Sequence, residues 1–214
     1  MVSSMDGAAT ADGLTAGLQT PADNRVFAAL RDLADAVLVG AHTVRQEGYA
    51  PVRLDAGRRA VRDRYGFADV LTTVVLSRRL DFDPAAPLFA GAGPEAPTVV
   101  LTCAAAPEET RTALSRTVDV LVCGDLAVDF GLARAALAER GLTRLLCEGG
   151  PTTFAELVAA DEWDELCLSL TPLLAGPGPQ RIVAGLPWPG DPRPVRMTGL
   201  LEEDGALFLR LTPR

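Results

Sequence analysis

Short apolar runs alternate with helical segments through most of the chain, and this alternation limits the possible folds more than any other feature. Each run is rich in valine or leucine and is bounded by turn residues, as expected of a strand buried on both faces of a parallel sheet. The runs are AVLVG at 36–40, TTVVLS at 72–77, TVVLT at 98–102, VDVLVC at 118–123 and RLLCE at 144–148. They predict five buried strands of a largely parallel sheet.

Helical signals fill the segments between these runs. The segment that begins at Thr20 has a threonine cap, a proline at the first helical position and Asp23 three residues after the cap, followed by apolar residues at helical spacing. PEETRTALSR after Ala106 and DFGLARAALAER from Asp129 indicate further helices, the second of which ends at Gly141. Repeated strand, helix, strand units place the chain in the α/β class.

The C-terminal third has a different pattern. The apolar segments DELCLSLTP, PVRMTGLLEED and ALFLRLTP follow one another with Gly and Pro turns, so we expect antiparallel strands on the edge of the sheet. Pro/Gly-rich segments at 84–97 and 175–194 are expected to be loops that do not divide the chain, and residues 1–214 are predicted to be one domain. The MVSS start leaves little room for a first strand, which we expect to be truncated.

Composition limits the possible partners. A net charge of −8 without a basic block argues against nucleic acid and anionic membrane surfaces, so a small molecule is the expected partner. No apolar run reaches the roughly eighteen residues that a membrane span needs, and the N-terminus lacks the pattern of a secretory signal. We therefore expect a cytoplasmic protein.

Cysteine and histidine offer little for a metal site. Cys103, Cys123, Cys147 and Cys167 lie far apart, each in an apolar stretch, and form no C-x-x-C pair, while His42 is the only histidine. We expect no bound metal and four buried, reduced thiols. His42 is expected to be an ordinary residue at a helix start.

The carboxyl ends of the predicted strands are where parallel α/β sheets bind ligands. The last run leads into Glu148, Gly149, Gly150 and Pro151. Two glycines would let a phosphate approach the main chain, and the N–H groups of a helix that starts at the proline would offer an anion site. A plain strand-to-helix turn explains the glycine pair equally well. GPGPQ at 176–180 lacks the spacing of a dinucleotide fingerprint and is interpreted as a loop.

Several motifs together resemble a known enzyme family. GAHT at 40–43, followed by TTVVLSRR, is similar to the cofactor half of dihydrofolate reductases. With SSMDGAAT near the start, LRDLADAVLVGAHTV and LLCEGGPTTFAELVAADEWDELCLSLTPLLAG, nearly the whole chain resembles more closely the pyrimidine reductase of riboflavin biosynthesis. The resemblance implies a dihydrofolate-reductase-like fold, with a mostly parallel central sheet flanked by helices. It also implies that NADPH reduces the ribose of a 5-phosphoribosylaminopyrimidine to a ribityl chain, by hydride transfer to the sugar C1 of a ring-opened imine.

The resemblance further implies a set of site residues. Asp6 and Glu148 are expected to be catalytic and to border the nicotinamide and the substrate, with Ser4, Gly7 and Glu47 on the substrate side. The implied cofactor-binding residues are Gly40, Thr43, Ser77, Arg78, Thr102, Gly149, Gly150 and Thr152. The serine and the arginine of this set are implied to lie near the 2′-phosphate of the adenine ribose.

The chain departs from the family pattern on the substrate side. Family members often carry Lys or Arg directly after S-x-D-G, where this chain has Ala8, and usually read T-V-x-x-D-D-P where this chain reads TVRQEGY, with Glu47 and Gly48. A same-fold reductase of another small carbonyl or imine is therefore one alternative. A non-catalytic nucleotide-binding module is another, against which Asp6 and Glu148 argue modestly. The zinc-deaminase signature that many such proteins carry is absent from these residues. The family is usually a homodimer that pairs through edge strands.

Overall fold

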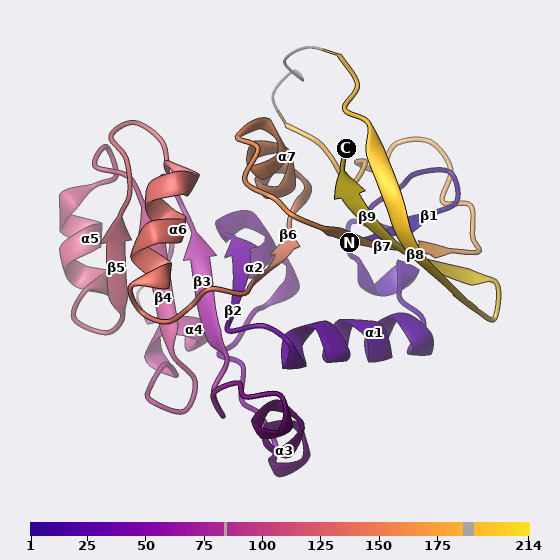
Figure 1. Ribbon diagram of the computed structural model, residues 1–214. Helices are drawn as coiled ribbons and strands as arrows, with labels where there is room; N and C mark the ends of the chain where they lie inside the picture. The colour runs from indigo at the N-terminus through magenta and orange to yellow at the C-terminus, as the bar shows by residue number, and fades with distance from the viewer. Residues whose placement is uncertain (84, 186–190) are drawn as a thin grey trace. The chain divides into compact units, whose positions relative to one another are not determined.

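The computed structural model describes residues 1–83, 85–185 and 191–214 (Figure 1). Contacts between residues divide the chain into two compact units, one made of Met1–Ala28 and Gly149–Arg214 and the other of Ala29–Glu148. Helix α1 (Pro21–Asp32) begins in the first unit and ends in the second. The single-domain organisation stays a prediction, and each unit is described by itself.

The second unit is built on a five-stranded sheet in the order β5–β4–β3–β2–β6 (Figure 1). Its strands are β2 (Ala36–Gly40), β3 (Thr72–Leu76), β4 (Thr98–Thr102), β5 (Asp119–Val122) and β6 (Leu145–Gly149). The pairs β2–β3, β3–β4 and β4–β5 are parallel. The predicted parallel sheet is confirmed, and its strands coincide with the apolar runs of the sequence to within about a residue at each end.

Central and edge strands of this sheet differ in burial. Every residue of β2, β3 and β4 is buried. Strand β5 is exposed or half-buried throughout, and β6 is half-buried except at Gly149. The prediction of buried strands is therefore wrong for β5 and β6, because in the described part of the chain each lies at one end of the strand order.

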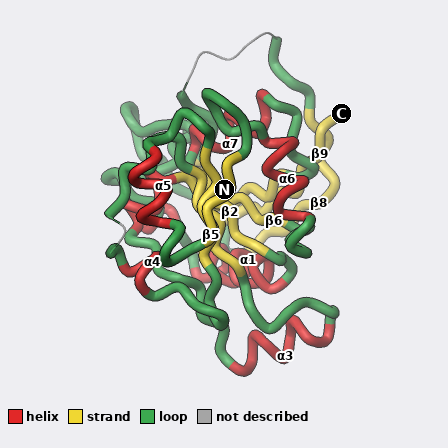
Figure 2. The backbone as a smooth tube through the Cα atoms, turned by 90° about the vertical axis from the view of Figure 1, so that its left-hand side faces the viewer, coloured by secondary structure: helices red, strands yellow, loops and turns green. Residues whose placement is uncertain are grey.

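Helices cover both faces of this sheet. They are α2 (Ala41–Glu47), α3 (Ala56–Arg64), α4 (Pro87–Ala90), α5 (Glu108–Leu114) and α6 (Phe130–Ala138). Figure 2 shows α4 and α5 on one side of the strands and α6 on the other. Val39, Val75 and Val100 of neighbouring strands share one core cluster with Phe89 of α4 and Leu114 of α5. Alternate residues of the parallel strands thus form the apolar face of the sheet against which α4 and α5 pack.

The two segments predicted as loops differ in outcome. The prediction for 84–97 is wrong over Pro87–Ala90, where Pro87 starts a short helix because Leu88 and Phe89, each 1% exposed, are drawn into the core. Residues 176–180 are irregular, as predicted. Residue 84 and residues 186–190 of these segments lie outside the described residues.

The first unit holds a four-stranded sheet in the order β1–β7–β9–β8. Its elements are β1 (Val2–Ser4), a 3₁₀ turn (Ala16–Leu18), α7 (Pro151–Ala159), β7 (Leu166–Thr171), β8 (Val195–Glu203) and β9 (Ala206–Pro213). Strands β7 and β9, and β8 and β9, are antiparallel, whereas β1 runs parallel to β7. The antiparallel pairing of the C-terminal strands is confirmed, but their expected place on the edge of the parallel sheet is wrong, because they pair with a strand from the MVSS start in a sheet of their own.

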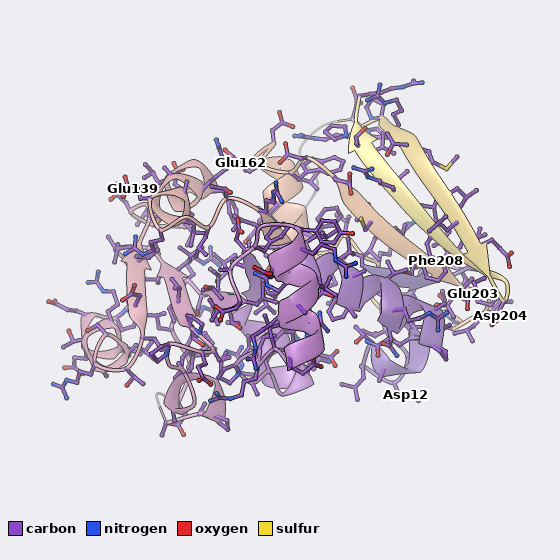
Figure 3. All side chains as sticks on the ribbon, turned by 60° about the horizontal axis from the view of Figure 1, so that its bottom comes forward. Asp12, Glu139, Glu162, Glu203, Asp204 and Phe208 are labelled. Carbon is purple, nitrogen blue, oxygen red and sulfur yellow. The ribbon has the colours of Figure 1, made fainter. Side chains whose placement is uncertain are left out.

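Strands β8 and β9 form a hairpin with a two-residue turn. Figure 3 labels Asp204 at this turn and Glu203 beside it. Asp204 and Gly205 have φ angles of 52° and 78°, the left-handed conformation that a type I′ turn requires. Strand β8 pairs with β9 alone in the described sheet, and it exposes large apolar side chains, with Met197 56% and Leu201 68% exposed.

The four cysteines are free thiols of two kinds. Cys103 and Cys123 are buried, as predicted. The prediction is wrong for Cys147 and Cys167, which are half-buried, because one lies on the edge strand β6 and the other near the start of β7. Burial, the hydrogen bond to Glu165 and the charge of Glu165 raise the pKa of the Cys167 thiol to about 11. Among the described helices, none has both the length and the apolar composition to cross a membrane.

Candidate active site

Glu148, at the end of β6, has its carboxylate held by two side chains. Arg31 donates from Nε to Oε1 and from Nη2 to Oε2 at 2.6 and 2.7 Å. The Tyr49 hydroxyl donates to Oε2 at 2.7 Å. The Glu148 side chain is 1% exposed and that of Arg31 is 22% exposed. A two-point arginine–carboxylate contact is the strong form of an ion pair. We call Arg31, Tyr49 and Glu148 the carboxylate cluster.

The turn that ends α2 places the hydroxyl of Tyr49 next to the Glu148 carboxylate. Gly48 adopts the left-handed conformation with φ 65°, which glycine takes without steric cost. The N–H groups of Gly48 and Tyr49 both donate to the carbonyl oxygen of Val44, which closes the helix. Burial, followed by the charge of Glu148 and the hydrogen bond to it, raises the pKa of the Tyr49 hydroxyl. Tyr49 is therefore a hydrogen-bond donor at neutral pH.

Arg31 belongs to the last turn of α1, where a cation complements the carbonyl end of a helix. Burial alone would lower the pKa of Arg31, but its hydrogen bond with Glu148 and the charge of Glu148 outweigh burial and raise that pKa. Arg31 and Glu148 thus form an ion pair inside the second unit.

Arg62 of α3 fixes the chain that follows α1. Its side chain is fully buried at 0% exposure, and burial lowers the pKa of its guanidinium. The guanidinium donates, at 2.7 to 3.3 Å, to the carbonyl oxygens of Arg31, Asp32, Ala34, Ala68 and Val70. Phe67 packs against the same group, with its ring centre 5.3 Å from Arg62 Cζ. The buried guanidinium is thus hydrogen-bonded by backbone carbonyl groups, and the nearby charges of Asp32 and Asp35 favour its ionised form.

Asp6 closes a loop of the first unit. The hydroxyl of Ser4 donates to Oδ1 of Asp6, and the N–H groups of Ala175 and Gly176 donate to Oδ1 and Oδ2 at 3.1 and 2.7 Å. The Ser4 hydroxyl in turn accepts from the N–H of Ala8 at 3.0 Å. These contacts, the Ser4 hydrogen bond first, lower the pKa of Asp6 to about 2. Asp6 is ionised at neutral pH and acts as an acceptor.

The Gly-Gly-Pro turn leads directly into α7. Gly149 has φ 102° and is joined to Gly150 by a cis peptide bond, while Gly150 caps the helix and Pro151 occupies its first position. Thr152 lies exposed in the first turn. The first N–H groups of a helix have no acceptor within it and give this end a partial positive charge. In the same unit Gly7, with φ 91°, follows Asp6.

Three predicted residues lie at or after the carboxyl end of β2. Gly40 ends the strand and caps α2, Thr43 is half-buried within α2, and Glu47 is its last residue. His42, also in α2, is exposed, which agrees with its interpretation as a helix-start residue.

The ends of β3 and β4 carry the next predicted residues. Ser77 is buried, and its hydroxyl accepts from the N–H of Leu80 at 3.0 Å, which fixes the turn after β3. Arg78 beside it is exposed. Thr102 is 0% exposed, and its hydroxyl has no hydrogen-bond partner among the described residues.

An open hollow of about 600 Å³ lies beside the ends of β4 and β5. Ala104, Gly124, Asp125, Val128 and Leu132 are among its lining residues. Its lining is about as polar as it is apolar and includes two carboxylates, those of Asp125 and Asp129, which disfavour a phosphate. None of these residues was singled out in the sequence.

Comparison with known proteins decides the family. The sequence profile of the RibD C-terminal domain matches residues 1–197. The chain belongs to this family. The 2,5-diamino-6-ribosylamino-4(3H)-pyrimidinone 5′-phosphate reductase of Archaeoglobus fulgidus is 28% identical over 154 residues, which cover 72% of this chain and 69% of the relative. The reductase of the same name from Aquifex aeolicus is 30% identical over 151 residues, 69% of this chain and 61% of the relative.

Solved structures agree with this assignment. A pyrimidine reductase-like protein from Corynebacterium diphtheriae superimposes with a TM-score of 0.88 at 26% identity, over 100% of this chain and 89% of that one. The deaminase/reductase of Thermotoga maritima has a TM-score of 0.72 at 20% identity, over 100% of this chain and 55% of that one, and shares the fold. The predicted resemblance to pyrimidine reductases and the predicted α/β fold are confirmed.

Within this RibD-type domain, the structure adds residues that the sequence did not indicate. Glu148 was expected at a ligand-facing strand end, and the structure surrounds it with Arg31 and Tyr49. Both residues sit within quoted motifs, LRDLADAVLVGAHTV and TVRQEGY, but no spacing rule connects them to Glu148. The Ser4 hydroxyl donates to the carboxylate of Asp6, two residues further along the chain. The roles of the predicted site residues stay predictions.

The residues present fit a nicotinamide dinucleotide. Gly149 and Gly150 lead into the start of α7, whose first N–H groups can bind a phosphate. The partnerless hydroxyl of Thr102 lies two residues before Ala104, which lines the hollow. An exposed cation, Arg78, follows the neighbouring strand. Each unit therefore has a group that can bind phosphate: the first N–H groups of α7 in the first unit and the Arg78 guanidinium in the second.

Proposed function

We propose that this RibD-type domain is an NADPH-dependent reductase that converts the ribose of a 5-phosphoribosylaminopyrimidine into a ribityl chain in riboflavin biosynthesis. The match of the family profile to residues 1–197 carries the proposal. The reductase name of the relatives from A. fulgidus and A. aeolicus supports it. The same name gives no support to a different carbonyl substrate or to a non-catalytic nucleotide-binding module.

The family and fold indicate a nicotinamide cofactor, and we assign NADPH. Gly40, Thr43, Gly149, Gly150 and Thr152 would hold its phosphates through backbone N–H groups and hydroxyls at helix starts. At the adenosine end of the cofactor, Ser77 and Arg78 after β3 would bind the 2′-phosphate. Thr102 and the hollow after β4 and β5 would bind the ribose and the base. An arginine supports a 2′-phosphate because its planar donors match phosphate oxygens.

The substrate side is assigned to two fixed anions. When bound, the reduced nicotinamide supplies a hydride. Glu148 would stabilise positive charge on the imine, because a preoriented carboxylate in a water-poor site interacts strongly with developing charge. Asp6, with a pKa of about 2, remains ionised and would accept hydrogen bonds from substrate, together with Ser4, Gly7 and Glu47.

We also propose that the domain forms a homodimer in the cytoplasm. The exposed apolar side chains of β8, among them Met197 and Leu201, support pairing with a second copy, because an apolar edge strand readily pairs with another strand. Four free thiols support a reducing compartment.

Oxidation of NADPH, followed at its absorbance band, tests the reaction. The 2,5-diamino precursor and its deaminated counterpart are supplied in parallel, each with NADPH and with NADH. We expect turnover with one of the two precursors and a ribityl product identified by mass spectrometry. Absence of turnover with both precursors would overturn the substrate assignment, and equal use of NADH would overturn the cofactor assignment alone.

A further inference from the structure

The hydrogen bonds of the carboxylate cluster come from two separate elements. Arg31 approaches Glu148 from the last turn of α1, and Tyr49 approaches it from the turn after α2. An ionised carboxylate has about four acceptor positions on its two oxygens. The described residues fill three of them, two on Oε2 and one on Oε1.

Tyr49 is the more rigid of the two donors. Its ring packs against the core cluster that contains Val39 and Val44, and the Gly48 turn fixes its backbone. A tyrosine side chain has two rotatable angles, whereas an arginine is long and loses more conformational freedom when it is held in place. The hydroxyl of Tyr49 therefore fixes the position of Oε2 of Glu148. The guanidinium of Arg31 then aligns with the plane of this carboxylate, because it contacts both oxygens.

Tyr49 ends the TVRQEGY segment, and nothing in this segment connects it with Glu148 in the sequence. The structure brings its hydroxyl to Oε2 of Glu148 at 2.7 Å. Because burial and the charge of Glu148 raise the pKa of Tyr49, the hydroxyl keeps its proton at neutral pH.

We propose that Tyr49 is a positioning residue for the reductase reaction: its hydroxyl fixes the orientation of the Glu148 carboxylate and, through it, the guanidinium of Arg31. The charges of Arg31 and Glu148 are then already in a single arrangement when substrate binds. The inference rests on the proposed function, since it assigns Tyr49 to the substrate side of that reaction.

Tyr49→Phe removes the hydroxyl and keeps the ring in the core cluster. We expect kcat/KM for the pyrimidine substrate to fall about tenfold to hundredfold, as for the loss of one hydrogen bond to a charged group. The Kd of NADPH should change less than about twofold, because the cofactor groups assigned above are elsewhere. Tyr65→Phe is the matched control, since Tyr65 is the other tyrosine of the chain and is 60% exposed. It should leave both kcat/KM and the Kd of NADPH unchanged.

A double-mutant cycle with Glu148→Gln separates positioning from a structural role. If Tyr49 acts through Glu148, Tyr49→Phe will have little further effect on kcat/KM, or on substrate affinity measured by calorimetry, in the Glu148→Gln background. Full activity of Tyr49→Phe in an active parent overturns the inference, as does an additive effect in the cycle or a loss confined to melting temperature. No turnover by the parent overturns the proposed function, and the calorimetric cycle then still decides whether Tyr49 and Glu148 are coupled in binding.

Discussion

The guanidinium of Arg31 and the carboxylate of Glu148 meet through two hydrogen bonds, 2.6 and 2.7 Å long. The two residues are 117 positions apart in the sequence, so the pair ties the last turn of α1 to the end of β6. Because the carboxylate is almost completely buried, removal of either member leaves a charge that water cannot fully solvate.

Glu148→Gln is expected to lower both stability and activity. Glutamine keeps the shape but leaves Arg31 without its counter-ion, so the free energy of unfolding should fall by about 1 to 3 kcal/mol. Turnover should fall about 10²-fold to 10³-fold if the carboxylate stabilises charge in the reaction. Urea denaturation and NADPH oxidation measure the two effects. Glu139→Gln, at an exposed site after α6, is the control, and full activity of Glu148→Gln would remove Glu148 from the reaction.

Arg62→Lys is expected to destabilise the protein by about 2 to 4 kcal/mol, because a lysine has three donors on one nitrogen and cannot reproduce the planar fork. The loss should appear in urea denaturation as a lower midpoint with an unchanged slope. Arg59→Lys in the same helix is exposed and should have almost no effect. Equal stability of the two variants would show that the carbonyl contacts of Arg62 contribute little.

Arg78→Ala is expected to weaken NADPH binding by about tenfold or more and to leave NADH binding almost unchanged, because only NADPH carries the 2′-phosphate. Fluorescence titration with each nucleotide gives the two dissociation constants. Arg64→Ala, an exposed arginine at the end of α3, controls for the loss of one positive charge. A parent protein that binds both nucleotides equally would contradict the assignment of Arg78.

Asp6→Asn is expected to show how stability depends on pH. The folded pKa of Asp6, about 2, lies below its ordinary value of 3.8, so its ionised form stabilises the fold above pH 4. This stabilisation is lost as pH falls through 3.8 toward about 2. The difference in melting temperature between parent and variant should therefore be constant at neutral pH and shrink across that window. If the difference in melting temperature grew as the pH fell, the lowered pKa of Asp6 would be contradicted.

Leu201→Glu is expected to weaken self-association, because it places a charge among the exposed apolar side chains of β8. Sedimentation velocity over a range of protein concentrations measures the change. Leu126→Glu is the control: Leu126 is 81% exposed and lies in the loop after β5. Monomeric parent protein, or equal association of both variants, would contradict a dimer through β8.

The sequence predicts the strands better than it predicts their order. The runs at 36–40 and 98–102 coincide with β2 and β4, because valine-rich segments between turn residues have few alternatives. Whether a strand lies at the centre or at the edge of the sheet cannot be predicted from its own residues. Strand β6 is the last of the five in sequence, yet it lies beside β2.

The partners of Glu148 were missed for the same reason. They are 117 and 99 residues away, and only the placement of β6 next to β2 brings them within reach. Arg62 was missed because AGRRAVRDR reads as a solvated, charged segment in which nothing distinguishes the buried arginine from its exposed neighbours.

All five acceptors of the Arg62 guanidinium described above are main-chain oxygens. Side chains can therefore be exchanged at Ala68 and Val70 without removing an acceptor, while deletions in this loop move the acceptors themselves. Tolerance to mutation is thus unevenly distributed: the side chains of Ala68 and Val70 are free to drift in evolution, and the arginine to which their carbonyl groups bind is not.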